Sequence, residues 1–242
     1  MRATYVPLSD RQAVQIAHLD QRVKLGTLSH QEARRTYDRI GSLQDSQGFY
    51  ENRATGLVLL HGNFNSAESV FEFGFGTGRF ALRLFAEYLS NTARYRGVDV
   101  SPKMVRLAAS RLAAYAPRVE VILTEGGPPV DEPAGYYDRF VSNYVFDLLS
   151  HEDIRAVLRE AHRMLRPDGL LCLSGLTSGT GFASRIVAGV VSWTQTRWPS
   201  LVGGCRPVDL LPFLPESEWQ VQHHSKVVAF GVPSEVVVAR KC

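Results

Sequence analysis

The chain has 242 residues, of which 45% are apolar and 21% are charged. A sequence of this kind can bury the core of one large domain, which excludes disordered, collagen-like and disulfide-dependent classes of protein. Lys and Arg total 27 against 24 for Asp and Glu, and this net charge of +3 gives no indication of a nucleic-acid partner.

The cysteines and the apolar segments indicate the cellular compartment in which the protein is expected. Cys172, Cys205 and Cys242 show no C-x-x-C spacing, so neither a zinc site nor a disulfide framework is expected. The N-terminus lacks the apolar core of a signal peptide, and no apolar run approaches the roughly 20 residues of a membrane span. We therefore expect a cytoplasmic protein without a transmembrane segment.

The first 66 residues carry two helical patterns. Residues 29–32, Ser-His-Gln-Glu, form a capping box that opens the second pattern, which continues to Ile40. The segment is too short and too polar for a core of its own. We predict that residues 1–66 form an N-terminal helical cap on a domain of residues 67–242.

Residues 69–166 alternate short β-rich runs with helical patterns, which is typical of parallel βαβ units. The predicted strands are residues 70–73, 95–99, 119–123, 138–142 and 170–174, and the predicted helices are residues 79–90, 102–115 and 152–165, the last with Ser150 as its N-cap. Two further strand-like runs, 219–230 and 234–240, are separated by only three residues, which permits an antiparallel hairpin but no parallel crossover. The sequence thus predicts an α/β fold with a seven-stranded, mostly parallel sheet and helices on both faces.

Three glycines lie at alternate positions between the first predicted strand and its helix. Gly74, Gly76 and Gly78 allow the backbone to turn tightly and to approach a ligand at the carboxyl edge of the sheet. As a G-x-G-x-x-G motif, the series fails at Arg79 when counted from Gly74 but closes on Ala81 when counted from Gly76. The glycines alone therefore leave a dinucleotide site as an alternative.

Two carboxylates accompany the glycines. Glu72 lies in an apolar strand, where a carboxylate is costly to bury without a partner such as an ammonium group. Asp99 ends the next strand, where a carboxylate can accept two hydrogen bonds from the cis-diol of a ribose. Together they predict a ligand that carries both an amine and a ribose.

These motifs resemble those of the class I S-adenosylmethionine-dependent methyltransferases. Residues 72–78 are similar to the family's first motif, residues 97–104 to its second, and residues 165–171 to the turn into its fifth strand. In overall plan the chain looks most like the ubiquinone and menaquinone C-methyltransferase-like group. The resemblance implies a Rossmann-like sheet with a C-terminal antiparallel hairpin, S-adenosyl-L-methionine as cofactor, S-adenosyl-L-homocysteine as product, and no metal. Glu72, the turn before the fifth strand and the hairpin favour this reading over a dinucleotide site.

The resemblance also assigns residues to the cofactor. It implies that Glu72 contacts the methionyl amine through backbone or water, that Asp99 holds the ribose hydroxyls, and that Met104 packs near the adenine. Tyr37, in the predicted cap, is expected to close over the cofactor. The predicted cofactor-binding residues are Tyr37, Glu72, Gly74, Gly76, Gly78, Asp99, Val100, Met104, Glu125, Gly126 and Asn143.

The chain departs from the family pattern at two positions. Phe75 stands where many relatives carry a small residue, which is expected to reshape the loop. Gly127 stands where the family usually has an acidic residue that accepts the adenine amino group. Either Glu125 is displaced into that role or a backbone carbonyl accepts the bond.

The acceptor is expected at the end of the fourth strand, at residues 143–147. This segment lacks the Asn-Pro-Pro-Tyr pattern of enzymes that methylate base nitrogens, so DNA is disfavoured as a substrate. Tyr144 and His151 are the candidate catalytic residues. Their alternatives are a packed aromatic with a satisfied hydroxyl and a helix-capping or surface residue.

The other histidines do not predict a metal site. His223 and His224 are adjacent in a predicted strand and should point to opposite faces. A structural role is expected for the remaining four, because none has a second ligand at suitable spacing. These are His18, His30, His61 and His162.

The segment before the hairpin differs in composition from the rest of the chain. Residues 169–208 contain no acidic residue, and Arg185, Arg197 and Arg206 lie among aromatic and aliphatic residues. Phe182, Ile186, Val190 and Trp193 fall on one face of a helix. We predict a helical lid, residues 177–206, that encloses a lipophilic acceptor or contacts a membrane surface peripherally; the alternative is a helix that packs on the sheet.

The function predicted from the sequence is S-adenosylmethionine-dependent methyl transfer to a small, lipophilic acceptor by in-line displacement. The alternatives are a phospholipid-amine N-methyltransferase and a non-catalytic S-adenosylmethionine-binding regulatory protein. The identity of the acceptor, the atom that is methylated and the oligomeric state are not encoded in any motif of the chain.

Overall fold

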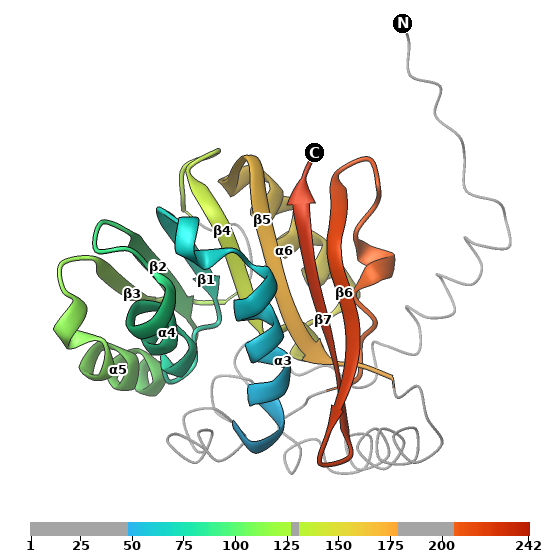
Figure 1. The fold of residues 1–242 in the computed structure, drawn as a ribbon, viewed down its shortest axis with the longest axis horizontal. Helices are drawn as coiled ribbons and strands as arrows, with labels where there is room; N and C mark the ends of the chain where they lie inside the picture. Colours follow the sequence, from blue (N-terminus) through green and yellow to red (C-terminus); the bar gives the residue numbers. More distant parts are fainter. Residues whose placement is uncertain (1–47, 127–130, 179–205) are drawn as a thin grey trace, which may run out of the picture.

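The computed structural model describes residues 48–126, 131–178 and 206–242, and these form a single seven-stranded sheet with helices on both faces (Figure 1). The strands are β1 Ser69–Phe73, β2 Arg94–Asp99, β3 Val119–Leu123, β4 Tyr137–Asn143, β5 Leu165–Leu176, β6 Trp219–Ala229 and β7 Val232–Lys241. The α-helices are α3 Gly48–His61, α4 Arg79–Arg83, α5 Pro102–Arg111 and α6 His151–Met164.

The strand order is β3-β2-β1-β4-β5-β7-β6. Strands β1 to β5 pair in parallel, whereas β7 runs antiparallel to both β5 and β6. Phe230 and Gly231 join β6 to β7 and both have positive φ angles, 51° and 82°, as expected for a two-residue hairpin turn. The predicted fold class is confirmed.

Two hydrophobic clusters lie on the two faces of the sheet. The first includes Val58 of α3, Ala81 of α4 and Ala108 of α5, and the second includes Ile154 and Val157 of α6. Successive residues of β7 alternate between the clusters, with positions 236 and 238 in the first and positions 237 and 239 in the second. The middle of the sheet is therefore buried on both faces.

Local signals explain most element boundaries. Ser150 caps α6 as predicted, because its Oγ accepts a hydrogen bond of 3.0 Å from the Asp153 N–H. The predicted helix of residues 79–90 ends as a π-helical turn at Leu84–Tyr88, and the predicted helix of residues 102–115 ends with a 3₁₀ turn at Ala113–Tyr115. The predicted turn at residues 166–169 lies inside β5 as an irregularity in its pairing with β4.

Helix α3 is not among the predicted helices. Residues 57–60, Leu-Val-Leu-Leu, are continuously apolar, so they lack the one-sided stripe that marks an amphipathic helix. The helix packs on β5, β6 and β7, and Ala54, Val58 and Leu59 are buried in the first cluster. The two predicted helical patterns of residues 1–40, including Tyr37, lie outside the described residues, as does the predicted lid except for residues 177, 178 and 206. No helix in the described segments is long and apolar enough to cross a membrane.

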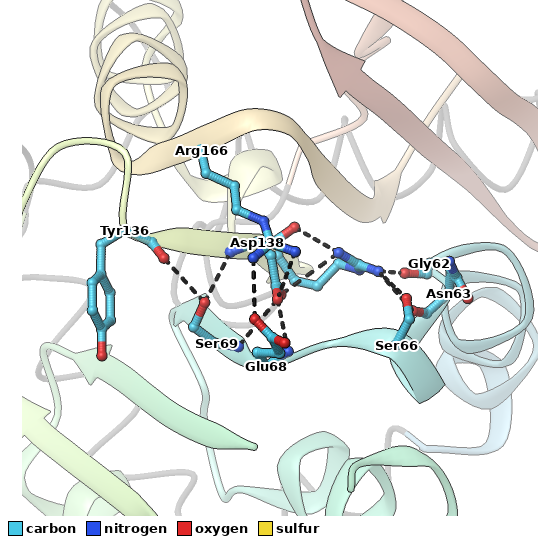
Figure 2. A network of polar contacts seen from close by, with 9 residues as sticks. Gly62, Asn63, Ser66, Glu68, Ser69, Tyr136, Asp138 and Arg166 are labelled. Atoms are coloured by element: carbon cyan, nitrogen blue, oxygen red, sulfur yellow. Dashed lines mark hydrogen bonds and ion pairs between the residues drawn. The ribbon is translucent and has the colours of Figure 1, made fainter. Parts of the chain in front are cut away.

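A buried polar network fastens the amino edge of the sheet (Figure 2). The Arg139 guanidinium, on β4, donates hydrogen bonds of 2.7 Å to the backbone carbonyls of Gly62 and Asn63, just after α3. The Asp138 carboxylate accepts a hydrogen bond of 2.7 Å from the Glu68 N–H and lies 3.5 Å from the Arg166 guanidinium. These bonds hold the end of α3 and the start of β1 against β4.

Candidate active site

The three glycines after β1 adopt backbone conformations that favour glycine. Gly74, Gly76 and Gly78 have φ angles of 78°, 54° and 77°. A Cβ atom on Gly74 would lie 2.3 Å from a methyl carbon of Val145, and one on Gly78 would lie 3.0 Å from the Ala108 Cβ. Larger residues at positions 74 and 78 would therefore disturb both the turn and the neighbouring segments.

Asp99 ties this turn to the end of β2. Its Oδ2 atom accepts a hydrogen bond of 2.9 Å from the Gly76 N–H, and its Oδ1 atom accepts one of 2.9 Å from the Ser101 N–H. These two bonds hold the carboxylate between the glycine turn and the start of α5. The predicted ribose contact of Asp99 stays a prediction.

Glu72 lies at the base of the site and is 1% exposed. The Tyr95 hydroxyl, on β2, donates a hydrogen bond of 2.7 Å to its Oε2 atom. Burial raises the pKa of the Glu72 carboxyl to about 7, against the smaller lowering effects of the Tyr95 and Asn143 side chains. A bound ammonium group would favour the ionised form, because an opposite charge offsets the cost of burial.

The absence of a side chain at Gly97 makes room for this arrangement. A Cβ atom at Gly97, which pairs with Glu72 across β1 and β2, would lie 2.8 Å from the Tyr95 hydroxyl and 2.7 Å from a ring carbon of Phe75. The Phe75 ring is 4% exposed. The large Phe75 side chain therefore fits in the loop because Gly97 has no side chain. Tyr95 was not predicted as a site residue; a hydroxyl one strand away from a buried acid is the signal that could have found it.

Asn143 ends β4 next to Glu72. The Ser174 hydroxyl, on β5, donates a hydrogen bond of 2.7 Å to the Asn143 Oδ1 atom. The Nδ2 atom of the same amide is buried and has no hydrogen bond of ordinary geometry with any described residue. The site thus presents an amide donor beside the carboxylate of Glu72.

A cleft opens over these groups, between the glycine turn, α3 and α4. It is lined by Glu51, Asn52, Thr55, Glu72, Gly74, Phe75, Gly76, Thr77, Arg79, Phe80, Arg83, Asn143 and Tyr144. Sequence reasoning found five of these residues, at positions 72, 74, 76, 143 and 144. It missed the wall from α3, because that helix was not predicted, and the two arginines of α4, which have no motif of their own.

The other predicted site residues lie elsewhere. Met104 is 1% exposed and packs in the first hydrophobic cluster, whereas Glu125 is exposed at the end of β3. His151 begins α6, where its ring packs edge-on against Phe213 with a centroid distance of 5.2 Å. Gly78, Asp99, Val100, Met104, Glu125, Gly126 and His151 are not among the described residues that line the cleft. Tyr37 and Gly127 lie outside the described residues.

Tyr144 is a cleft residue with a strained backbone. Its φ angle is 55°, its hydroxyl donates a hydrogen bond of 2.8 Å to the Ser234 Oγ atom, and its ring meets Tyr50 edge-on at a centroid distance of 5.8 Å. Burial raises the pKa of the Tyr144 hydroxyl above its usual value, which keeps it protonated near neutral pH. Tyr144 is therefore poorly suited to act as a general base.

Two histidines lie on opposite faces of the sheet, as the strand alternation predicts. The His223 ring stacks on the His61 ring of α3 at a centroid distance of 3.6 Å, and the His224 Nε2 atom lies 2.7 Å from a Glu235 carboxylate oxygen. Within the described segments, no group of three or more His, Cys, Asp and Glu side chains could hold a metal ion.

Comparisons with known proteins agree with this fold. Residues 70–169 match the family model of a methyltransferase domain. The carboxy-S-adenosyl-L-methionine synthase of Chromohalobacter salexigens is 34% identical over 107 residues, which cover 43% of this chain and 38% of that protein. The chain therefore matches well under half the length of this curated relative.

Several solved structures share the fold at low sequence identity. The [4+2]-cyclase SpnF has a TM-score of 0.68 at 17% identity, over 89% of this chain and 98% of that chain. The N-methyltransferase NodS from Bradyrhizobium japonicum WM9, in complex with S-adenosyl-L-homocysteine, has a TM-score of 0.59 at 16% identity, over 79% and 87%. The geranyl diphosphate C-methyltransferase from Streptomyces coelicolor A3(2) has a TM-score of 0.60 at 11% identity, over 79% of each chain.

The family match covers the glycine turn and most of the parallel part of the sheet. Residues 70–169 match a methyltransferase domain, and they lie within a seven-stranded sheet that has the predicted antiparallel C-terminal pair.

Proposed function

We propose that this protein transfers a methyl group from S-adenosyl-L-methionine to a small acceptor and releases S-adenosyl-L-homocysteine. The observation that carries the proposal is the pairing of Glu72 and Asn143 in the cleft. A carboxylate beside a buried amide donor complements the ammonium and carboxylate groups of a methionyl moiety.

The chain fits this cofactor at several points. Glu72 would accept hydrogen bonds from the ammonium group, Asn143 Nδ2 would donate to the carboxylate, and Asp99 would accept from the ribose hydroxyls. When bound, the cofactor supplies a methyl group on a positively charged sulfur, which is already a good leaving group. The chain's own contribution is to hold and align the reactants, which is the main source of rate in such a displacement.

For the acceptor we propose a small, lipophilic molecule. The support is the acid-free stretch of residues 169–208, with its aromatic residues and three arginines, and the likeness in plan to ubiquinone and menaquinone C-methyltransferase-like enzymes. The geranyl diphosphate C-methyltransferase, which shares the fold, is named for an apolar molecule with an anionic group, and this supports an acceptor of that kind. A phospholipid amine is the second candidate, for which the same cationic and apolar stretch is the supporting feature.

The fold also occurs in proteins named as a [4+2]-cyclase and as a carboxy-S-adenosyl-L-methionine synthase, so cofactor binding and methyl transfer need separate tests. Calorimetry with S-adenosyl-L-homocysteine tests binding. Glu72→Gln should weaken the affinity by roughly 10- to 100-fold, since it removes a charge-assisted hydrogen bond. Glu68→Gln, at the amino edge, is the matched control and should bind normally.

Transfer is tested with S-adenosyl-L-methionine that is labelled on its methyl group and incubated with the lipid and aqueous fractions of a cell extract. Label in the lipid fraction, dependent on Glu72, supports the lipophilic acceptor. Label only in the aqueous fraction contradicts it. Intact cofactor binding without label in either fraction would support a non-catalytic regulatory protein instead.

A further inference from the structure

The residue after β4, Tyr144, adopts a conformation that is unfavourable for a tyrosine. The φ angle of 55° lies in the left-handed region that non-glycine residues rarely adopt, and such strain concentrates at functional sites. In an extended strand, Asn143 and Tyr144 would point to opposite faces of the sheet. The left-handed turn places both side chains in the cleft, while Val145 packs against the second hydrophobic cluster on the other face.

Hydrogen bonds from two neighbouring strands hold this conformation. The Tyr144 N–H donates a bond of 2.7 Å to the backbone carbonyl of Ser174 on β5, and the Tyr144 hydroxyl donates one of 2.8 Å to Ser234 on β7. Both serines are 2% exposed. Tyr144 is therefore fixed by buried partners on strands that lie 30 and 90 residues further along the chain.

Ser174 connects Tyr144 to the amide of Asn143. Its carbonyl accepts from the Tyr144 backbone, and its hydroxyl donates to the Asn143 Oδ1 atom at 2.7 Å. Because Oδ1 is engaged there, the Nδ2 atom is directed away from Ser174. A reversed amide would instead place its oxygen near the Glu72 carboxylate, where two acceptors repel each other.

We propose that Tyr144 and Ser234 are positioning residues that hold the Asn143 amide, through Ser174, with its donor directed into the cleft beside Glu72. This inference rests on the proposed function, because the group that receives the hydrogen bond is the carboxylate of the cofactor. Fixing the amide before binding lowers the entropy cost of binding, since the side chain no longer has to be ordered by the ligand. The strained backbone of Tyr144 therefore contributes to recognition of the cofactor by fixing the Asn143 amide.

The test uses the full chain and S-adenosyl-L-homocysteine as the probe. Tyr144→Phe and Ser234→Ala each remove one hydroxyl of the same hydrogen bond. Each should weaken the affinity about fivefold, the range expected for one neutral hydrogen bond, and the double variant should lose no more than either single variant. Ser234→Thr keeps a hydroxyl and should restore most of the affinity.

A matched control separates positioning from general stability. Tyr137→Phe removes a hydroxyl that donates a hydrogen bond of 2.6 Å to Glu132 at the opposite edge of the sheet. It should lower the melting temperature and leave the affinity unchanged. If affinity falls in proportion to stability in Tyr137→Phe as well as in Tyr144→Phe, the role of Tyr144 is merely structural and the inference is wrong.

Further variants distinguish failure of this inference from failure of the proposed function. Asn143→Ala should lose more affinity than Tyr144→Phe. Normal binding by Tyr144→Phe and Ser234→Ala, together with weak binding by Asn143→Ala, would overturn only the positioning role. Normal binding by both Asn143→Ala and Glu72→Gln would overturn the proposed cofactor site itself. If Tyr144→Phe folds poorly, faster hydrogen exchange of the Asn143 side-chain amide in Ser234→Ala tests the same point by NMR; unchanged exchange would contradict it.

Discussion

The two edges of the central sheet use polar residues differently. At the amino edge, Arg139 and Asp138 are buried and bonded to the backbone of neighbouring segments, and these bonds join α3, β1 and β4. At the carboxyl edge, burial raises the pKa of Glu72 to about 7, and the buried Asn143 Nδ2 atom makes no hydrogen bond of ordinary geometry to a described residue. The difference teaches that the polar groups of the amino edge join segments of the sheet, whereas those of the carboxyl edge line the cleft that we propose as the cofactor site.

The largest effect is expected at the amino edge. Arg139→Ala should lower the free energy of unfolding by roughly 3–5 kcal/mol, because it strips hydrogen bonds from several carbonyls and leaves Asp138 buried without its neighbour. Urea denaturation measures the loss, and Arg94→Ala, at an exposed position on β2, should change stability by less than about 0.5 kcal/mol. Similar stability of the two variants would mean that the network is not structural.

The second-largest effect is expected for a glycine of the turn that follows β1. Gly74→Ala combines a positive φ with a clash against Val145, and we expect a loss of about 2–3 kcal/mol together with loss of cofactor binding. Gly135→Ala has a φ of 64° but no atom within 4 Å of the added Cβ, so it isolates the backbone cost, about 1 kcal/mol. If thermal denaturation shows that Gly74→Ala and Gly135→Ala lose equal amounts of stability, close packing around Gly74 is unimportant.

Asp99→Ala should weaken S-adenosyl-L-homocysteine binding about thirtyfold, equivalent to roughly 2 kcal/mol, because the variant lacks the carboxylate that we propose to bind the ribose hydroxyls. The structure adds that the Gly76 and Ser101 N–H groups lose their acceptor, so a lower melting temperature should accompany the effect. Calorimetry that shows unchanged affinity would remove Asp99 from the cofactor site.

The smallest and most specific effect concerns pH. Since burial raises the pKa of Glu72 to about 7, the acid is partly protonated in the ligand-free protein, and an ammonium-bearing ligand must displace that proton. Affinity for S-adenosyl-L-homocysteine should therefore fall as pH is lowered from 7 to 5.5, by at most about tenfold per pH unit. Glu72→Gln should flatten the profile; an equal slope in that variant would assign the effect to another group.

The stability of the ligand-free protein should depend on Glu72 in the opposite direction. A folded-state pKa above the unfolded value means that the protonated acid favours folding, so this contribution is present at low pH and is lost as pH rises through about 7. The Glu72→Gln variant should not show this loss. The same residue thus weakens binding and favours folding as pH falls.

The glycine turn, the two acids and the positions of the strands along the chain could be predicted from the sequence, because each depends on local chemistry. A glycine at positive φ, an acid that interrupts an apolar strand and a serine cap are read from a few neighbouring residues. Helix α3 and the arginines on the cleft wall could not be predicted in this way. The apolar run of α3 is stabilised as a helix by packing on β5, β6 and β7, and these strands are distant from it in the sequence.

The site itself was decided by the tertiary structure. The Tyr95 hydroxyl reaches Glu72 because β1 and β2 are neighbours, and Ser174 and Ser234 reach Asn143 and Tyr144 because β5 and β7 follow β4 in the sheet. The sequence by itself determined which residue types stand at the carboxyl edge. Their partners, the raised pKa of Glu72 and the direction of the Asn143 amide depend on burial and on contacts between distant segments, which exist only once the sheet has assembled.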